Sequence, residues 1–331
     1  MSWRRIFGLA LVAVCLVGCE EGGGAKSRTI GFTVMDISNP FFVACEQGAR
    51  GVVEQHGDQL QVVNGDSSAS KQLSATEDFI QRGVACILFN PVNSDAAGAA
   101  VEKANAAGIP VVTFDVNASS GDIACFVESN NVLAGKLCAD YVGWRLKGKG
   151  KVVIIDHPAV TSVVQRTDGF KARLAEKYPE IEIVKTLVGE GKRGPSMKVT
   201  ENILGGDVKF DAIFAINDPT GLGATKAIKD AGAKDIFVVA IDGAPDAVAE
   251  LKVEGSPFAM SVAQFPNEIA RTAAEMAYEI IGGKTVPKHV KIPVMPVTRD
   301  NLGQYPGWEG TMPEQVSVPW ETDLKIAREA E

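Results

Sequence analysis

The chain has 331 residues, of which 46% are hydrophobic and 22% are charged. These values are typical of a globular protein of about two domains and exclude a disordered or fibrous chain. The net charge of -8 and the three histidines argue against a nucleic-acid partner, a histidine-rich metal centre and a histidine-dependent catalytic triad, because these need clustered cations or several imidazoles.

The N-terminus predicts export. Arg4 and Arg5 precede an apolar run over residues 6–18, which is shorter than the roughly 20 residues of a membrane-spanning helix and predicts a signal peptide over residues 1–18. The run ends in Leu16-Val17-Gly18-Cys19, which resembles a bacterial lipobox. We therefore expect Cys19 to carry lipid and residues 19–27 to form a tether. The alternative is an ordinary signal peptide with an incidental cysteine.

The rest of the chain alternates short apolar runs with amphipathic stretches, which predicts parallel sheets with helices on both faces. The apolar runs predict strands over residues 29–34, 60–64, 85–90, 110–115, 123–128, 151–156, 181–187, 211–217, 236–242 and 258–263. The amphipathic stretches predict helices over residues 40–56, 69–82, 94–107, 132–146, 163–178, 195–204, 221–231 and 267–281. The rhythm repeats in the two halves, which indicates an α/β fold of two similar units.

The remaining cysteines are Cys45, Cys86, Cys125 and Cys138, and none forms a C-x-x-C pair. Zinc and thioredoxin-type sites are therefore not expected. Export permits disulfides, but the apolar neighbours of these cysteines favour buried free thiols. If a disulfide forms, the pair Cys125–Cys138 is the prediction.

Polar residues stand at the ends of several apolar runs, namely Asn90, Asp115, Asn217 and Asp242. Ligands of open α/β sheets bind outside the carboxyl ends of the strands, and Asn and Asp are otherwise depleted in strands. These four residues therefore predict a shared binding cleft. The alternative is that each caps the following helix or begins a turn.

Two glycine patterns do not indicate a nucleotide cofactor. Residues 189–194 match G-x-G-x-x-G, but Pro195 follows directly and the motif lies far from the first strand. Residues 143–149 have the spacing of a phosphate-binding loop, but Gly150 replaces the required Ser or Thr. No cofactor, metal or catalytic pair is expected.

Several segments together resemble one known family. The most specific is Asp36-Ile-Ser-Asn39-Pro40-Phe41-Phe42. The similarity continues in order over residues 87–91, 110–115, 128–135, 166–170, 212–218, 239–246 and 263–266. These segments resemble the periplasmic sugar-binding proteins of the ribose-binding-protein family, which are the substrate receptors of bacterial ABC importers and have the type I periplasmic binding protein fold.

The resemblance implies two Rossmann-like lobes, each a parallel sheet flanked by helices, joined by a three-strand hinge. By position the hinge crossings fall near residues 129–130, 264–265 and 293–294. The expected N-terminal lobe comprises residues 28–129 and 265–292. The expected C-terminal lobe comprises residues 130–264 and 293–304, and residues 305–331 form an extension.

The resemblance also implies which residues contact ligand. Polar contacts are carried over to Asn39, Asn90, Asp115, Arg166, Asn217, Asp242 and Gln264, and aromatic contacts to Phe41 and Phe42. Amides, carboxylates and guanidinium groups match the donors and acceptors of sugar hydroxyls. We expect one of the two phenylalanine rings to face the ligand and the other to pack in the core.

Three positions depart from the ribose-binding pattern, namely Met35, Val116 and Gly191. They remove a hydroxyl, a charged donor and a stacking ring. Ribose is therefore not the expected ligand, and a different pentose, a hexose, a polyol or a cyclitol each fits. Lys192, Arg193, Asp36 and His157 are alternative candidates to fill the space.

The extension carries Trp308 and Trp320, which are expected to anchor it to a lobe rather than to contact ligand. A short charged helix is expected over residues 321–331.

The sequence thus predicts a lipid-anchored, monomeric substrate-binding protein of a carbohydrate ABC importer, with a membrane permease as partner and no enzymatic activity. Three alternatives remain. One is a receptor that presents its ligand to a chemoreceptor or sensor kinase. Another is a receptor for a nucleoside or furanosyl signal. The third is a glycosidase, which is disfavoured because Asp115 and Asp242 fall on different lobes of the implied fold.

Overall fold

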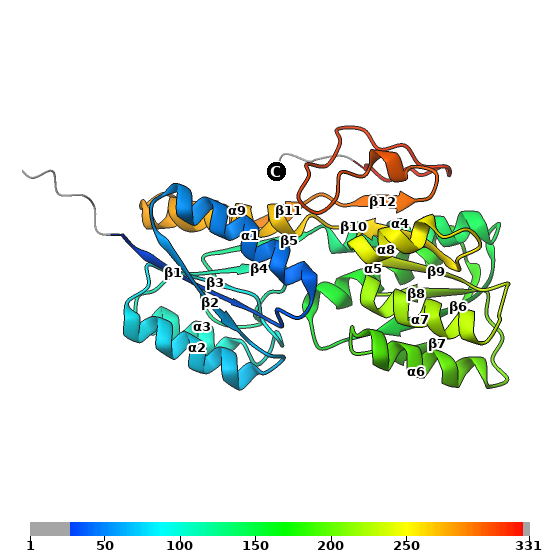
Figure 1. Cartoon of the computed structure of the whole chain (residues 1–331), viewed down its shortest axis with the longest axis horizontal. Coiled ribbons are helices and arrows are strands. Elements are labelled where there is room, and N and C mark those ends of the chain that lie inside the picture. Colours follow the sequence, from blue (N-terminus) through cyan, green and yellow to red (C-terminus); the bar gives the residue numbers. More distant parts are fainter. Residues whose placement is uncertain (1–26, 327–331) are drawn as a thin grey trace, which may run out of the picture.

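The computed structural model describes residues 27–326, which form two α/β lobes side by side (Figure 1). The predicted signal peptide, Cys19 and most of the predicted tether lie outside the described residues. Among residues 27–326, no helix is long and apolar enough to cross a membrane.

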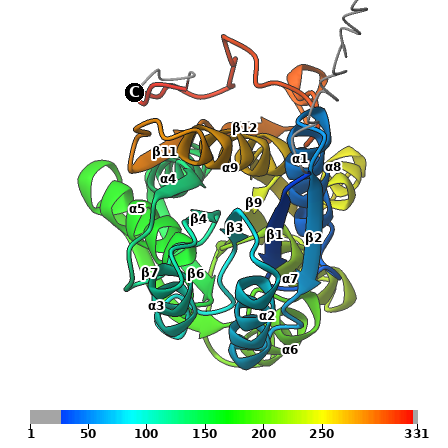
Figure 2. The ribbon, with the colours of Figure 1, turned by 90° about the vertical axis from the view of Figure 1, so that its left-hand side faces the viewer.

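The first lobe is built on a parallel six-stranded sheet. Its strands are β1 (Thr29–Val34), β2 (Gln59–Asn64), β3 (Cys86–Phe89), β4 (Val111–Phe114), β5 (Cys125–Ser129) and β11 (His289–Ile292). They lie in the order β11-β5-β4-β3-β1-β2. Its helices are α1 (Pro40–Gln55), α2 (Ala69–Arg82), α3 (Gly98–Ala106) and α9 (Pro266–Ile281). Helices α1 and α9 cover one face of the sheet, and α2 and α3 cover the other (Figure 2).

The second lobe repeats this architecture with one antiparallel strand. Its strands are β6 (Lys149–Asp156), β7 (Glu180–Val188), β8 (Ala212–Ala215), β9 (Phe237–Asp242), β10 (Phe258–Ala263) and β12 (Met295–Thr298). Their order is β12-β10-β9-β8-β6-β7, and the edge strand β12 runs antiparallel to β10. Its helices are α4 (Asn131–Arg145), α5 (Thr161–Lys177), α6 (Arg193–Leu204), α7 (Asp218–Asp230) and α8 (Pro245–Lys252).

The chain passes between the two sheets three times. It leaves the first sheet after β5, returns between β10 and α9, and leaves again between β11 and β12. Each passage begins at the carboxyl end of a strand, namely β5, β10 or β11. Because the neighbouring strands run parallel to these, the carboxyl ends of the parallel strands in each sheet face the other lobe.

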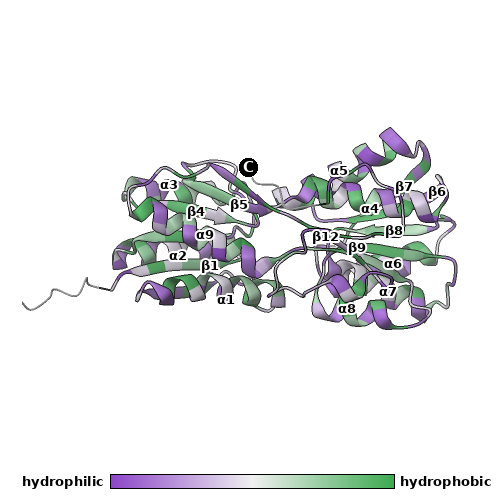
Figure 3. Cartoon of the chain, turned by 90° about the horizontal axis from the view of Figure 1, so that it is seen from above, coloured by the Kyte–Doolittle hydropathy of each residue, from purple (hydrophilic) through white to green (hydrophobic). Residues whose placement is uncertain are grey.

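Burial explains why the strands form where they do. The central strands β3, β4, β8 and β9 are buried along their whole length, as expected for parallel strands with helices on both faces. Coloured by hydropathy, the strands of both sheets form the apolar interior of each lobe (Figure 3). The predicted strand 29–34 and helix 69–82 coincide with β1 and α2.

Differences from the predicted elements occur mainly at their ends. The predicted helix 94–107 starts only at Gly98, and the predicted strand 211–217 covers only Ala212–Ala215, because Asn217 already caps α7. Helix α8 and strands β11 and β12 were not predicted. These three elements are short and carry too few residues for a clear periodicity.

The extension follows a one-turn 3₁₀ helix (Leu302–Gln304) and is otherwise irregular through residue 326. The charged helix predicted over residues 321–331 is wrong for residues 321–326, and the remainder lies outside the described residues. Thr322 bonds to Asp140, and Asp323 forms ion pairs with Arg173 and Lys177 of α5. These tertiary contacts replace a helix that is too short to be stable alone.

Cys45, Cys86, Cys125 and Cys138 are buried free thiols, as favoured from the sequence. The alternative pair Cys125–Cys138 is not formed. Cys125 lies in β5 of the first lobe, whereas the Cys138 sulfur of α4 lies 3.6 Å from the Ala240 carbonyl oxygen in the second.

Helix α1 offers a matched pair of substitutions that tests the packing of the first lobe. A Cβ at Gly48 would lie 2.1 Å from the backbone oxygen of Asn267 in α9, whereas a Cβ at Gly51 meets nothing within 4 Å. We expect Gly48→Ala to destabilise the lobe by about 1–3 kcal/mol through overpacking. Gly51→Ala should stabilise it by up to about 1 kcal/mol through helix propensity. Urea unfolding of both variants measures the difference, and equal effects would contradict the close helix contact.

Candidate functional site

The predicted polar residues at the strand ends come together between the two sheets. Asn90 and Asp115 directly follow β3 and β4 of the first lobe. Asp242 ends β9 and Gln264 directly follows β10 of the second lobe. All four side chains are buried, although Asn and Asp side chains are normally exposed.

Asn90 organises the half of the site that belongs to the first lobe. Its side-chain oxygen accepts a hydrogen bond from the Met35 backbone N–H at 3.0 Å. Its amide nitrogen donates to the Phe114 carbonyl at 3.1 Å and to the Asp115 carboxylate at 3.2 Å. Asp115 itself has a φ of 61°, a left-handed conformation that is uncommon outside glycine. The end of β4 is thus held in a shape that sets the direction of the carboxyl group.

Arg166 and Asp242 form the half of the site that belongs to the second lobe. The guanidinium of Arg166, on α5, donates to the Ile216 carbonyl at 2.9 Å and lies 3.6 Å from the Asp242 carboxylate. Gln264 also binds Asp242, because its amide donates to the same carboxylate at 2.7 Å. The side-chain oxygen of Gln264 is buried and has no hydrogen-bond partner among the described residues.

The electrostatics of the two halves are linked. Burial raises the pKa of Asp115 to about 7. The positive charge of Arg166 lowers this pKa, and the negative charge of Asp242 raises it further. Burial likewise raises the pKa of Asp242 to about 6, again opposed by Arg166. Removing a carboxylate from water disfavours its charged form. The Arg166 charge therefore acts on carboxyl groups from both lobes.

A series of polar contacts near the hinge, which the sequence did not reveal, supports Arg166. The Arg166 Nε donates to the Asn131 side chain at 2.8 Å, and the Asn131 amide donates to the Glu128 carboxylate at 3.0 Å. Glu128 is buried at the end of β5 and pairs with His289 of β11 at 2.9 Å. Burial raises the pKa of Glu128. Glu128 and Asn131 stand in a segment that contributed to the family resemblance, but nothing in the sequence assigned them this contact.

Asp218 is a second residue that the sequence analysis missed. It is fully buried behind Asp242, accepts hydrogen bonds from the Ser261 hydroxyl and the Ala244 N–H, and donates its own backbone N–H to Asp242. Burial raises its pKa. The only signal was its position next to Asn217, because its partners lie far away in the sequence.

Other predicted site residues have structural contacts of their own. Asn39 and Asn217 cap α1 and α7, and Asn217 also donates to the Gly191 carbonyl at 3.1 Å. Phe41 and Phe42 are both buried and meet edge to face, with 5.4 Å between ring centroids. For Asn217 the sequence also allowed a capping role, and the structure confirms it: Asn217 follows β8 and caps α7.

The three departures from the ribose-binding pattern lie around the same region. Met35 packs against an apolar cluster with residues from both lobes and against a second cluster made mainly of second-lobe residues, to which buried Val116 belongs. A Cβ at Gly191 would lie 3.4 Å from the Asn217 amide and 3.8 Å from the His157 ring. Of these candidates, Lys192 lies near Asp36 of the first lobe. Partial burial raises the pKa of Asp36, but hydrogen bonds from Ser38 and Ser67 and the positive charge of Lys192 outweigh it, so the pKa is lowered.

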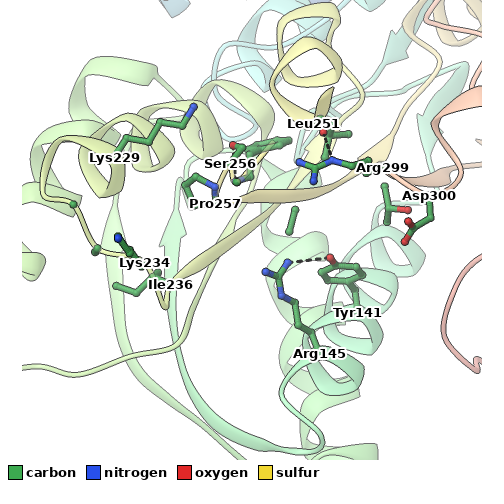
Figure 4. Close-up of a pocket in the computed structure, with 16 residues that line it drawn as sticks. Tyr141, Arg145, Lys229, Lys234, Ile236, Leu251, Ser256, Pro257, Arg299 and Asp300 are labelled. Atoms are coloured by element: carbon green, nitrogen blue, oxygen red, sulfur yellow. Dashed lines mark hydrogen bonds between the residues drawn. The ribbon is translucent and has the colours of Figure 1, made fainter. Parts of the chain in front are cut away.

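A basic groove of about 700 Å³ lies elsewhere on the second lobe and does not include the predicted site residues. It is lined by Arg145, Lys229, Lys234 and Arg299, and it sits where β9 and β10 begin (Figure 4). Its charges are largely engaged, since Arg145 lies over the Phe237 ring and Arg299 donates to the Leu251 carbonyl. Within residues 27–326, no group of three or more His, Cys, Asp or Glu side chains is arranged to hold a metal ion.

Comparison with known proteins identifies the class. The family model of the periplasmic binding protein domain matches residues 30–285. The chain is 36% identical over 276 residues to the ribose import binding protein of Bacillus subtilis, covering 83% of this chain and 88% of the relative. This chain belongs to the periplasmic binding protein family, whose members are exported solute-binding proteins.

Solved structures agree with this assignment. An ABC transporter solute-binding protein from Bacillus halodurans with bound myo-inositol superimposes with a TM-score of 0.79 and 26% identity, covering 86% of this chain and 98% of that one. A periplasmic solute-binding protein from Actinobacillus succinogenes with bound D-allose superimposes with a TM-score of 0.78 and 27% identity, covering 84% and 100%. The expected fold, two α/β lobes of the type I kind, is confirmed.

The buried carboxyl group of Asp115 gives a testable pH dependence. Its pKa in the folded protein is about 7, above its ordinary value of 3.8, so ionisation costs stability increasingly between about pH 4 and 7 and fully above pH 7. Asp115→Asn removes that cost. We expect the gain in unfolding free energy to be roughly 2–3 kcal/mol larger at pH 8 than at pH 5.

Urea unfolding of the unliganded protein at the two pH values measures this gain. Asp207→Asn, at an exposed position of the second lobe, is the control and should show no such pH dependence. A gain for Asp115→Asn that is equal at both pH values would contradict a buried carboxyl group with a raised pKa.

Proposed function

We propose that the protein is the substrate-binding lipoprotein of a carbohydrate ABC importer, and that it binds a monosaccharide or polyol between its lobes. One observation carries the proposal. Buried carboxylate and amide groups from the strand ends of both sheets converge on the Arg166 guanidinium of α5, which acts electrostatically on Asp115 and Asp242 from the two lobes. A ligand between the lobes would contact both halves at once.

The chemistry of these groups suits a neutral, hydroxyl-rich ligand. Carboxylates accept hydrogen bonds from hydroxyls, and a guanidinium donates to them in a fixed planar geometry. The buried Gln264 oxygen, which lacks a partner among the described residues, supplies a further acceptor. The residues proposed to contact ligand are Asn39, Phe41, Phe42, Asn90, Asp115, Arg166, Asn217, Asp242 and Gln264.

The ligand that we propose is not specifically ribose. Met35 and Val116 place apolar side chains where the lobes meet, and Gly191 contributes no side chain beside Asn217 and His157. A polyol, a cyclitol or a hexose with an apolar C–H face fits such a wall. The relatives bound to myo-inositol and D-allose support this range of ligands.

Binding would couple to closure of the lobes. The lobes already touch away from the hinge, where the Thr161 N–H at the start of α5 lies 3.3 Å from the Ser94 hydroxyl oxygen. A ligand that contacts both lobes only in the closed form shifts the population toward that form. We propose that the closed form of a monomer is recognised by a membrane permease, and that Cys19 holds the protein at the membrane through its lipid.

The proposed function includes no covalent chemistry. The raised pKa values of Asp115 and Asp242 arise mainly from burial, and the Asp242 carboxylate is already engaged by Gln264 and the Asp218 N–H. Recovery of the bound sugar unchanged after prolonged incubation, as measured by NMR, is the expected result. Turnover of the sugar or of a chromogenic glycoside would contradict it.

A ligand screen tests the proposed function. Ribose, D-allose, myo-inositol, xylitol and a set of nucleosides are each tested for their effect on thermal unfolding. A true ligand at about 100 times its dissociation constant should add roughly 2.7 kcal/mol of stability. Stabilisation by a nucleoside but by no carbohydrate would overturn the sugar assignment.

Variants then test the site. Asp115→Ala, Arg166→Ala and Asp242→Ala should each weaken binding by about 10- to 100-fold, because each removes a buried charged hydrogen-bonding group. Asp207→Ala, an exposed aspartate of the second lobe, is the control. Titration calorimetry measures the affinity, and circular dichroism checks that each variant is folded. Unchanged affinity in the three site variants would mean that the ligand binds elsewhere.

A further inference from the structure

The C-terminal extension reaches from the second lobe to the first beside the proposed ligand site. It runs along the hinge side of the molecule, over β12 and toward α1 (Figure 1). Its described part is fixed to the second lobe on both sides of Trp308. Asn301, just before the extension, donates to the carbonyls of Pro296 in β12 and of Ser317, both at 2.9 Å, and Thr322 donates to the Asp140 carboxylate at 2.7 Å. The segment between these anchors therefore has a defined position.

Trp308, in the middle of this segment, contacts residues of the proposed site from both lobes. Its indole N–H donates to the backbone carbonyl of Asp242 at 2.7 Å. Its ring packs edge to face against Phe41 of the first lobe, with 5.8 Å between centroids and 88° between planes. The side chain is only 8% exposed, so its N–H depends on this carbonyl for a partner.

Tyr305 holds the next carbonyl in the chain. Its hydroxyl donates to the Gly243 carbonyl at 2.8 Å. The backbone of this turn is unusual, with a φ of 145° at Asp242 and 71° at Gly243. A Cβ at Gly243 would lie 2.7 Å from the Tyr305 hydroxyl and 2.5 Å from the Ala263 Cβ. Such a conformation persists only where its surroundings hold it.

We propose that Trp308 and Tyr305 are positioning residues for the ligand site, which fix the Asp242–Gly243 turn and thereby the direction of the Asp242 carboxylate. The proposal rests on the proposed function, because it assigns the extension a part in ligand affinity. By joining Phe41 to the Asp242 backbone, Trp308 also links ligand-contacting elements of the two lobes directly, in addition to the three chain crossings.

Removal of the two donors, with an aromatic ring kept at each position, tests the proposal. Trp308→Phe and Tyr305→Phe keep most of the packing but lose the hydrogen bonds to the Asp242 and Gly243 carbonyls. The matched control is Trp320→Phe. Trp320 is the other tryptophan of the extension, packs against Tyr141, and has an indole N–H with no partner among the described residues.

Affinity for the sugar identified in the screen is measured by titration calorimetry, together with urea unfolding of the unliganded proteins. We expect the dissociation constant to rise about 5- to 10-fold for Trp308→Phe and about fivefold for Tyr305→Phe, the worth of one net hydrogen bond. Trp320→Phe should stay within about twofold of the wild type. A merely structural role would lower the free energy of unfolding of Trp308→Phe and Tyr305→Phe and leave their affinity unchanged, and this result would overturn the proposal.

Amide hydrogen exchange of the unliganded full chain gives a second readout that needs no sugar. Peptides covering residues 239–246 should exchange faster in Trp308→Phe and Tyr305→Phe than in the wild type, whereas Trp320→Phe should leave them unchanged. Unaltered exchange in this segment would overturn the proposal. If the wild type binds no sugar, the proposed function fails, and the exchange result still decides whether the extension positions the turn.

Discussion

The buried positive charge of Arg166 is the interaction on which the site depends. Two carboxyl groups from different lobes, Asp115 and Asp242, are buried where a carboxylate without a counter-charge would be strongly disfavoured. Arg166 offsets part of that cost for both. The raised pKa values show that the compensation is incomplete. The unliganded site is therefore costly to ionise and well suited to a ligand that supplies additional donors.

The hinge and the extension both contact the charged residues of the site, Arg166 and Asp242. Arg166 is held through Asn131 by Glu128, and these two residues flank the first passage between the sheets. Asp242 is held from its backbone side by Trp308, which reaches the first lobe at Phe41. Segments that connect the lobes thus also orient the side chains between them. Such an arrangement ties the geometry of the site to the relative position of the lobes.

Much of the fold could be predicted, and the site only partly. The apolar runs of the central strands and the amphipathic helices depend on local periodicity, so β1 and α2 agree with their predicted ranges. Asp115 and Asp242 were found because a polar residue at the end of a buried strand is conspicuous. Arg166 was found through a family resemblance alone. The charged helix predicted over residues 321–331 was wrong over residues 321–326, because Asp323 and Thr322 bind side chains of α5 and α4 instead.

By itself the sequence determined the α/β class, the repeated strand–helix pattern and the polar strand ends, because these follow from the chain's local hydrophobic pattern. Only the tertiary structure decided that Glu128, Asn131 and Asp218 support the site and that Trp308 reaches Asp242. These contacts join residues far apart in the chain, such as His289 with Glu128 and Trp308 with Asp242. No local periodicity encodes such pairs, since they depend on how the two sheets and the extension come to lie together.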